Sequence, residues 1–435
     1  MKLTTRVWKG IAVGGAFLLA VTACGGAGEG EAVEADLNTS ETTDDAQDDA
    51  PAGETIKIGV LSTSEGNLAF GMDEAKAAIE VAMAGRDGDA NGGAVGQADV
   101  EFVYAGTDGT TSSAQTQVKR LVESDEVDIV LGPASGDEGE TVVQYALTAP
   151  DVTFVNGAAS PVGMTLEGAD NFFRFMGDSV MWMGGVGEYA YEELGYENMY
   201  LLAEDYSFPY DNAGGFFSEF CDAGGEIVGA SWVPVGTTDY ATIISQIPDD
   251  ADAIYVGLGG ADAASFLSQA VAGGFEKPLV GGSITIDTTA LSGDANIASA
   301  AVGMISGGPV PGEGYDNPLW EEFVEDYGDM PSAEFPEPSI FALLYYLATE
   351  SLLQGIENSG GDLSDNQAAL REALAQTDWD SPTGKLTLDD NHQAIVDNFL
   401  TEVIESDSGL TTSTVSTTQG IEQGTVEYDR FDTCF

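Results

Sequence analysis

The sequence predicts an α/β protein made of two similar lobes, each with a parallel β-sheet covered by helices on both faces. One observation is that short apolar, β-branched runs alternate with amphipathic stretches from Thr55 onward. A second is that the alternation begins again after residue 179, with the same architecture but without a sequence repeat. A third is the length of 435 residues with 43% hydrophobic residues, which suffices for two domains with a substantial core.

Four βα units follow one another in the first half of the chain. After the run DVEFVYAG, for example, the helical stretch places Val118, Leu121 and Val122 on one face. Consecutive units of this kind are typical of a parallel sheet. The predicted strands are 56–61, 99–106, 127–132 and 152–157, and the predicted helices are 71–85, 111–124 and 138–147.

The second half repeats this pattern and then becomes more helical. The predicted strands are 198–204, 226–233, 251–260, 277–283 and 301–308, with strand-like segments at 383–390 and 394–407. The predicted helices are 211–225, 240–248, 261–274, 317–328, 338–359 and 366–377. Ligands of open α/β sheets bind at the carboxyl ends of the strands, so two such edges facing each other predict a cleft that closes around a ligand.

The charge balance excludes one class of partner. The chain has 74 acidic residues against 13 Lys and Arg, a formal net charge of −61. Nucleic acid is excluded, because its phosphates require clustered Lys and Arg, and direct electrostatic attachment to anionic lipid is disfavoured for the same reason. The acidic excess is instead typical of a strongly hydrated surface suited to high external salt.

The N-terminus has the pattern of a secretory signal. Lys2, Arg6 and Lys9 precede the apolar run IAVGGAFLLAV, which is too short to span a membrane. The run ends in VTACGG, and the small residues before Cys24 resemble a bacterial lipobox, in which the cysteine becomes the lipidated N-terminus. The alternative is an ordinary signal peptide with an incidental Cys24. We expect residues 1–23 to be a lipoprotein signal peptide.

Residues 24–54 have the composition of a tether. There are ten acidic residues and no basic ones between Gly25 and Glu54, with almost no large apolar side chains. Such a segment cannot bury enough surface to offset chain entropy, so we expect it to be disordered and extended by self-repulsion. The sequence thus predicts a globular body on the extracytoplasmic side of the cell membrane, attached through its lipid anchor only.

Two further cysteines, Cys221 and Cys434, are present. In an oxidising compartment, two left-over thiols of an exported protein favour one disulfide. That disulfide would join the C-terminal segment DRFDTCF to the predicted helix that contains FFSEFCDAGG.

The motifs of common enzymes are missing from the sequence. The single histidine, His392, lies in the turn-like DDNHQA, and there is no HExxH, GxSxG or P-loop spacing. Neither half has a glycine fingerprint followed by an acidic residue at the distance that a dinucleotide site needs. We expect no catalytic residue, metal or cofactor. The alternative of another class is a secreted hydrolase with a carboxylate pair, since two acids can meet from anywhere in a fold.

Several segments, in their order, resemble type I periplasmic binding proteins, and in particular the Leu/Ile/Val-type (branched-chain amino acid) substrate-binding lipoproteins of ABC importers. These segments are IGVLSTSEGNLAFG, LGPASG, VNGAASP, LLAEDYSFPYDNAGG and SPTGKLTLDDN, and the resemblance covers nearly all of residues 55–407. It implies two Rossmann-like lobes joined by a three-strand hinge. Lobe I would comprise 55–177 and 308–379, and lobe II would comprise 178–307 and 380–435.

The resemblance also implies a ligand site. GPASG matches the loop that holds a ligand carboxylate, so Ser135 and Gly136 are candidates, and GAASP places Ala158 and Ser160 at the next strand end. Tyr206 matches an aromatic residue of the second lobe that closes over the ligand. The alternative for the two serines is an ordinary turn role.

Three further positions are candidates on weaker grounds. Phe70 lies where the family has an aromatic wall, although packing is the alternative. The family places an acidic residue that binds an α-ammonium group after a strand ending like KPLVGG, but this chain has Ser283 there, and Asp287 four residues on is the substitute.

These expectations combine into one function. The chain would be a monomeric, lipid-anchored receptor that captures a small polar metabolite, a branched-chain or other amino acid, between its lobes and delivers it to ABC permease subunits. An amide, urea or a small organic acid is the alternative ligand for the same role.

The anchor can be tested by mutation. We expect Cys24→Ala to release the protein from membranes, because the lipid would be its only attachment, whereas Cys434→Ala should leave retention unchanged. Membrane and soluble fractions of cells expressing each variant measure this. Full retention of Cys24→Ala would contradict lipidation.

Overall fold

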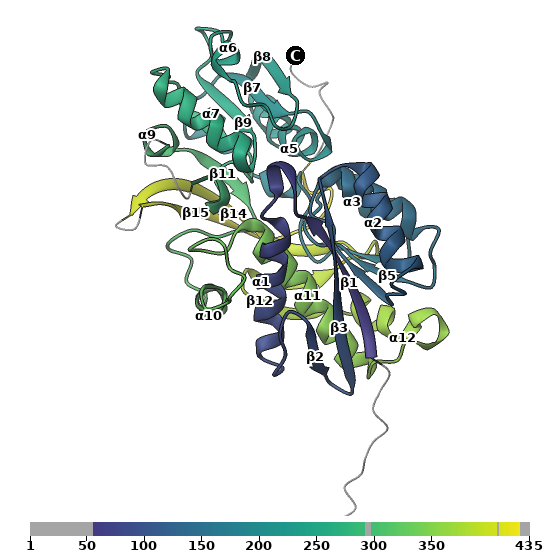
Figure 1. Cartoon of the computed structure of the whole chain (residues 1–435). Helices are drawn as coiled ribbons and strands as arrows, with labels where there is room; N and C mark the ends of the chain where they lie inside the picture. The colour runs from purple at the N-terminus through teal and green to yellow at the C-terminus, as the bar shows by residue number, and fades with distance from the viewer. Residues whose placement is uncertain (1–54, 292–296, 407–408, 427–435) are drawn as a thin grey trace, which may run out of the picture. The chain divides into compact units, whose positions relative to one another are not determined.

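The computed structural model describes residues 55–291, 297–406 and 409–426. These residues form two sheets with helices on the faces of each (Figure 1). We call the first sheet with its helices the first lobe and the second sheet with its helices the second lobe. The predicted α/β fold of two lobes is confirmed.

The first lobe is built on six strands in the order β2-β3-β1-β4-β5-β6. All neighbours are parallel except β2 and β3. The central strands β4 and β5 are buried along their whole length because helices cover both faces, whereas β3 alternates buried and exposed residues in its first half. Their bounds are β1 Thr55–Thr63, β2 Gly92–Val95, β3 Ala98–Thr107, β4 Ile129–Leu131, β5 Thr153–Val155 and β6 Phe172–Phe173.

Each face of the first sheet has its own core. Ile58 and Val60 of β1 face the cluster that contains α1 (Gly71–Ala84) and α11 (Ile340–Ser359). Leu61 faces the opposite cluster, with α2 (Thr111–Glu123) and α3 (Gly136–Ala146). The helices α10 (Pro318–Gly328) and α12 (Ser364–Ala375) contact α1 and α11 respectively.

The second lobe contains the parallel strands β8, β7, β9, β10 and β11, and β11 pairs with the antiparallel β14. One face packs against α4 and α5, and the other against α7, α8 and α9. The strands are β7 Asn198–Glu204, β8 Glu226–Val233, β9 Ala253–Gly257, β10 Leu279–Gly281 and β11 Ile305–Gly308. The helices are α4 Val186–Glu192, α5 Ser207–Ala223, α6 Ala241–Ile244, α7 Gly260–Ala272, α8 Thr288–Leu291 and α9 Ala298–Ala301.

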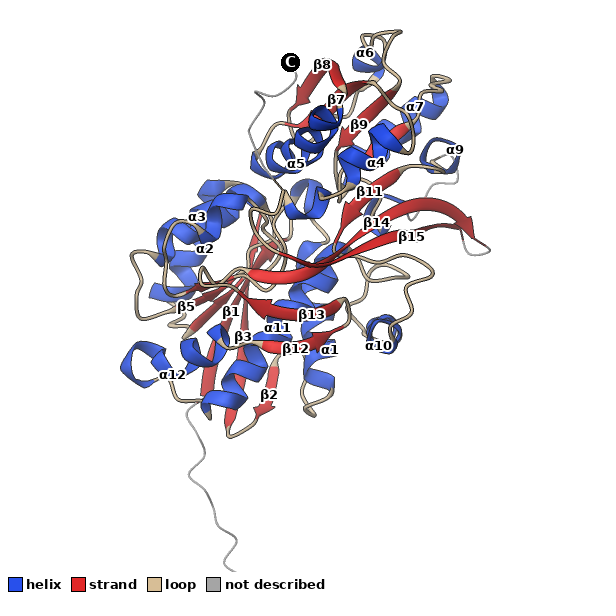
Figure 2. Ribbon diagram, turned by 180° about the vertical axis from the view of Figure 1, so that it is seen from behind, coloured by secondary structure: helices blue, strands red, loops and turns tan. Residues whose placement is uncertain are grey.

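The chain passes between the lobes three times. The first passage is 174–185, between β6 and α4, and the second is 309–317, between β11 and α10. The third is β14 (Ala394–Ser406) itself, because Val396 belongs to the core of the first lobe whereas Phe399 pairs with β11 (Figure 2). The strands β12 (Asp378–Ser381) and β13 (Gly384–Leu388) lead into β14, and Leu386 joins the core of the first lobe. The residue limits predicted for the lobes stay a prediction.

Several elements differ from the sequence prediction: α4, α8, α9 and the short strands β2, β6 and β12 were not predicted. Two other differences have a plain physical cause. The helix predicted over 240–248 is a single turn, α6, because Pro248 cannot continue a helix and Ile243 and Ile244 are only half-buried. The strand β15 (Gly409–Ile421), which pairs with β14, was not predicted. Its sequence is rich in Thr and Ser, so it has β-propensity without an apolar alternation.

The predicted disulfide and anchor are only partly within the described residues. Cys221, on α5, is disulfide-bonded. Its predicted partner Cys434 and the predicted lipidation site Cys24 lie outside the described residues. Within the part of the chain that is described, no helix combines the length and apolar character needed to cross a membrane.

The close packing of α11 on the first sheet can be tested at Gly157, which follows β5. A Cβ atom on Gly157 would lie 2.4 Å from the Tyr345 Cζ atom, and the Tyr345 hydroxyl donates to the Leu61 carbonyl at 2.7 Å. We expect Gly157→Ala to lower the free energy of unfolding in urea by about 1–3 kcal/mol, because the buried ring must shift. Gly163→Ala is the control, since its Cβ would contact nothing within 4 Å. Equal effects of the two variants would contradict this packing.

Candidate functional site

A cavity lies where the strand ends of the two lobes meet, and we call it the first cavity. It holds about 330 Å³ of empty space, open solvent included. Both lobes contribute to its lining, and none of the lining side chains is charged. The lining residues are Leu68, Ala134, Ser135, Gly136, Ala158, Ser160, Trp182, Tyr206, Phe208, Ile284, Ile340, Phe341 and Leu344.

One end of the first cavity is polar. Ser135 is the N-cap residue of α3, yet its hydroxyl makes no capping hydrogen bond. The Ser160 hydroxyl has no hydrogen-bond partner among the described residues, while its carbonyl accepts from Ser179. The Ala158 N–H donates to the Pro133 carbonyl at 2.8 Å and so joins the two loops. Two hydroxyls and the first N–H groups of α3 therefore remain available at this end.

A buried cation lies behind the polar end. Arg174, which is fully buried, donates from Nη1 to the Pro161 carbonyl at 2.7 Å and from Nε to Gln393. Its Nη2 atom lies 3.9 Å from Asp178 Oδ2. Burial lowers the pKa of Arg174 to about 10, and Asp178, Asp211 and Asp389 oppose that change. The guanidinium therefore stays charged at neutral pH and makes the potential at Ser160 and Pro161 more positive.

The rest of the first cavity is apolar and aromatic. The Phe208 ring centroid lies 6.0 Å from that of Trp182 and 6.2 Å from that of Tyr206. Trp182 is 2% exposed, and its Nε1–H has no acceptor among the described residues. Burial raises the pKa of Tyr206 well above its ordinary value, with Glu204, Asp137 and Asp262 adding to the effect, so the phenol is neutral.

Hydrogen bonds between the lobes enclose the first cavity. The Ser207 N–H donates to Asp137 Oδ1 at 3.1 Å, and the Val162 N–H donates to Asp211 Oδ2 at 3.0 Å. Asn67 Nδ2 donates to Glu204 Oε1 at 2.9 Å. The lobes approach so closely that a Cβ atom on Gly136 would lie 2.6 Å from Ser207 Oγ.

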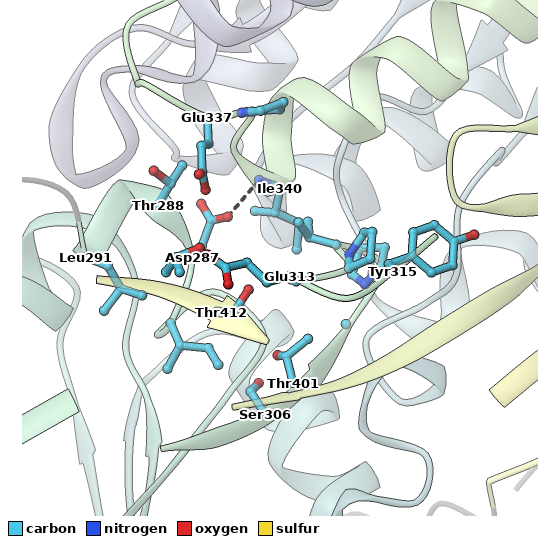
Figure 3. A pocket seen from close by; sticks show the side chains of 18 of the residues that line it. Asp287, Thr288, Leu291, Ser306, Glu313, Tyr315, Glu337, Ile340, Thr401 and Thr412 are labelled. Carbon is cyan, nitrogen blue, oxygen red and sulfur yellow. Dashed lines mark hydrogen bonds between the residues drawn. The ribbon is translucent and has the colours of Figure 1, made fainter. Parts of the chain in front are cut away.

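Ser283 and Asp287 line a different space, which we call the second cavity (Figure 3). It holds about 1030 Å³, open solvent included, and only Ile340 borders both cavities. The Ile340 N–H donates to Asp287 Oδ1 at 2.9 Å, which joins the second lobe to the start of α11. Burial raises the pKa of Asp287 to about 7. Ser283 Oγ accepts from Asn212 Nδ2 at 3.0 Å.

Phe70 lies outside both cavities. Its ring packs edge-on against Phe335, with 5.5 Å between centroids, and against Phe341 at 5.3 Å. It thus supports Phe341, which does line the first cavity. The ligand-binding role of all eight candidates stays a prediction, but Ser135, Gly136, Ala158, Ser160 and Tyr206 lie together.

Sequence reasoning missed the aromatic residues Trp182, Phe208 and Phe341. Trp182 comes from the 3-10 turn η3 (Met181–Met183) in the first passage, and the other two come from the starts of α5 and α11. Their only sequence signal is a large aromatic next to an element boundary. As for metal binding, the described residues contain no group of three or more His, Cys, Asp and Glu placed to hold an ion.

Comparison with known proteins relates the chain to one family. A family model described as periplasmic binding protein matches residues 55–409. The Leu/Ile/Val-binding protein homolog 6 of Brucella melitensis biotype 1 is 25% identical over 83% of this chain and 90% of its own length.

Two solved structures have the same fold. The ABC transporter substrate-binding protein from Sphaerobacter thermophilus is 24% identical, with a TM-score of 0.75 over 85% of this chain and 99% of its own. A solute binding protein from Rhodopseudomonas palustris BisB5, in complex with 3,4-dihydroxy benzoic acid, is 20% identical, with a TM-score of 0.76 over 85% and 99%.

The buried Asp287 predicts a pH dependence of stability. Its pKa is raised from 3.8 to about 7, so the folded protein keeps this proton while the unfolded chain releases it. The contribution of Asp287 to stability is therefore complete below pH 4 and is lost as the pH rises to 7, by at most about 4 kcal/mol. Asp287→Asn stays neutral and accepts the same N–H, so its stability relative to the wild type should increase over this pH range.

Urea unfolding of both proteins from pH 4 to 8 measures this difference. The exposed Asp250→Asn is the control and should follow the wild-type curve. A constant difference between Asp287→Asn and the wild type would show that Asp287 is ionised at all these pH values.

Proposed function

Because the chain belongs to the periplasmic binding protein family, we propose that its first cavity holds the ligand, a small molecule with a carboxylate or amide head and an apolar body. The predicted resemblance to type I periplasmic binding proteins is confirmed by the family match and the shared fold. The chain is a solute-binding protein of an ABC transporter and works outside the cytoplasm. Proteins of this family bind a small molecule and contact ABC permease components. Their fold and family are those of receptors.

The convergence of predicted residues on one enclosed cavity carries the proposal. Ser135, Gly136, Ala158 and Ser160 come from two strand ends of the first lobe, and Tyr206 comes from the second lobe. Hydroxyls and helix N-terminal N–H groups donate well to ligand oxygens, and the cation of Arg174 adds to this preference. The aromatic walls bury the remainder of the ligand.

Two relatives bear on the ligand. One is named for Leu/Ile/Val binding, and another is solved with 3,4-dihydroxy benzoic acid. Both kinds of molecule combine a carboxylate with an apolar or aromatic body, which matches the polar and apolar ends of the first cavity. The full proposal is a monomeric receptor, anchored by a lipid on Cys24, that delivers such a molecule to its permease.

A ligand screen tests this function. We expect at least one of a panel of amino acids, aromatic and aliphatic acids, amides and urea to raise the melting temperature of the purified protein, because a ligand that binds only the folded state stabilises it by mass action. Titration calorimetry then gives its affinity. A panel without any binder would contradict the proposed ligand class.

Variants then test the site. Ser135→Ala and Ser160→Ala should each weaken binding by roughly 5- to 50-fold, the loss of a hydrogen bond to a charged head, without lowering the melting temperature of the free protein. Ser218→Ala is the matched control, because its buried hydroxyl also lacks a hydrogen-bond partner in the described residues but lies on α5 outside both cavities. Unchanged ligand affinity in both Ser135→Ala and Ser160→Ala would mean that the ligand binds outside the first cavity.

A further inference from the structure

We infer that the ligand of the first cavity is a monocarboxylate that carries no α-ammonium group, bound with its carboxylate at the Ser135–Ser160 end. This inference rests on the proposed function and specifies its ligand class. The evidence is the placement of charged groups and unpaired donors around the cavity.

No carboxylate is available for an ammonium group in the first cavity. Its lining contains no Asp or Glu. A buried ammonium without a paired anion is strongly unfavourable, because hydroxyls and carbonyls replace only part of its hydration. An α-amino acid would bring such a group next to its carboxylate, into the end where Arg174 already supplies positive charge.

Ser283 and Asp287 occupy the position expected for a residue that binds the ammonium group, but neither can bind an ammonium group in the first cavity. Ser283 has no charge, and its hydroxyl accepts from Asn212. Asp287 lines the second cavity, on the far side of Ile340, and accepts the N–H of that residue. An ammonium group in the first cavity would have to displace Ile340 to reach the Asp287 carboxylate.

The carboxylates nearest to Ser135 and Arg174 are Glu138, Asp178 and Asp211, and they accept from the N–H groups of Gly109, Val180 and Val162 respectively. None of them lines the first cavity.

Three further carboxylates near the cavity also have partners. Asp137 accepts from the Ser207 N–H, Glu204 accepts from Asn67, and Asp262 accepts from the Gly236 N–H at 2.7 Å. None of the three lines the first cavity. Burial and the neighbouring Asp262 raise the pKa of Glu204 well above its ordinary value, so Glu204 is a poor partner for a cation.

The unpaired groups of the cavity match a carboxylate. The hydroxyls of Ser135 and Ser160 are free at its polar end, beside the N-terminus of α3. Orphaned buried donors are costly, so a ligand that supplies acceptors gains by satisfying them.

Matched ligand sets test the charge preference. Each set contains an acid, its α-amino acid and its amide: 4-methylpentanoate, leucine and 4-methylpentanamide, and 3-phenylpropanoate, phenylalanine and 3-phenylpropanamide. Benzoate and 4-hydroxybenzoate extend the acids. Calorimetry with the purified protein at one fixed salt concentration gives each dissociation constant. The net charge of −61 repels an anion more than a zwitterion, so a preference for the acid must come from the cavity.

We expect the acid of at least one set to bind at least about tenfold more tightly than its α-amino acid, as an unpaired buried ammonium requires. The acid should also bind more tightly than its neutral amide, because its charged head lies near the Arg174 cation. An α-amino acid that binds as tightly as its acid would overturn the inference and leave the proposed function standing. Failure of all acids, amino acids and amides to bind would instead remove the proposed function, and the inference with it.

Discussion

The buried guanidinium of Arg174 is the interaction on which the arrangement of this protein depends. It holds Pro161 at the polar end of the first cavity and Gln393 just before β14. Through Asp178, whose Oδ1 accepts from the N–H groups of Val180 and Met181, it also fixes the turn that presents Trp182. Burying a charge costs several kcal/mol unless it is paired and hydrogen-bonded, so these segments must keep their positions together. One side chain thus links two passages between the lobes to the cavity that they enclose.

The acidic residues of this chain have two different tasks. Most lie on a solvated surface, but a few join the lobes by accepting N–H groups from the opposite side, as Asp137, Asp211 and Asp287 do. Two of these three accept from the first residue of an α-helix, where the dipole favours a carboxylate. A chain with 13 Lys and Arg has few cations for ion pairs between lobes. Hydrogen bonds from backbone N–H groups take the place of such ion pairs between the lobes. These hydrogen bonds are not lost when salt screens charge.

Much of the fold was predictable because parallel strands covered on both faces appear as near-continuous apolar runs, of which Ile129–Leu131 is typical. The five residues that meet in the first cavity were predictable because each follows a strand end in a motif. Trp182 and Phe341 were not, because an aromatic residue that lines a cavity has the same local pattern as one in a core. The position of Asp287 depends on the packing of α11 across the lobe boundary, which no local pattern encodes. The strand β15 was missed because its Thr-rich sequence has no apolar face.

The continuity of β14 restricts how the lobes can move. The strand belongs to the first lobe at Val396 and to the second at Phe399, so any opening must bend a hydrogen-bonded ribbon instead of a loose linker. Its pairing with β15 shifts register at two places, between Val396 and Asn398 and between Leu400 and Thr401, and irregularities of this kind are where strands bend most easily. The first shift lies where the strand passes from one lobe to the other, so a bend there would move the lobes against each other while the paired residues on either side keep their register.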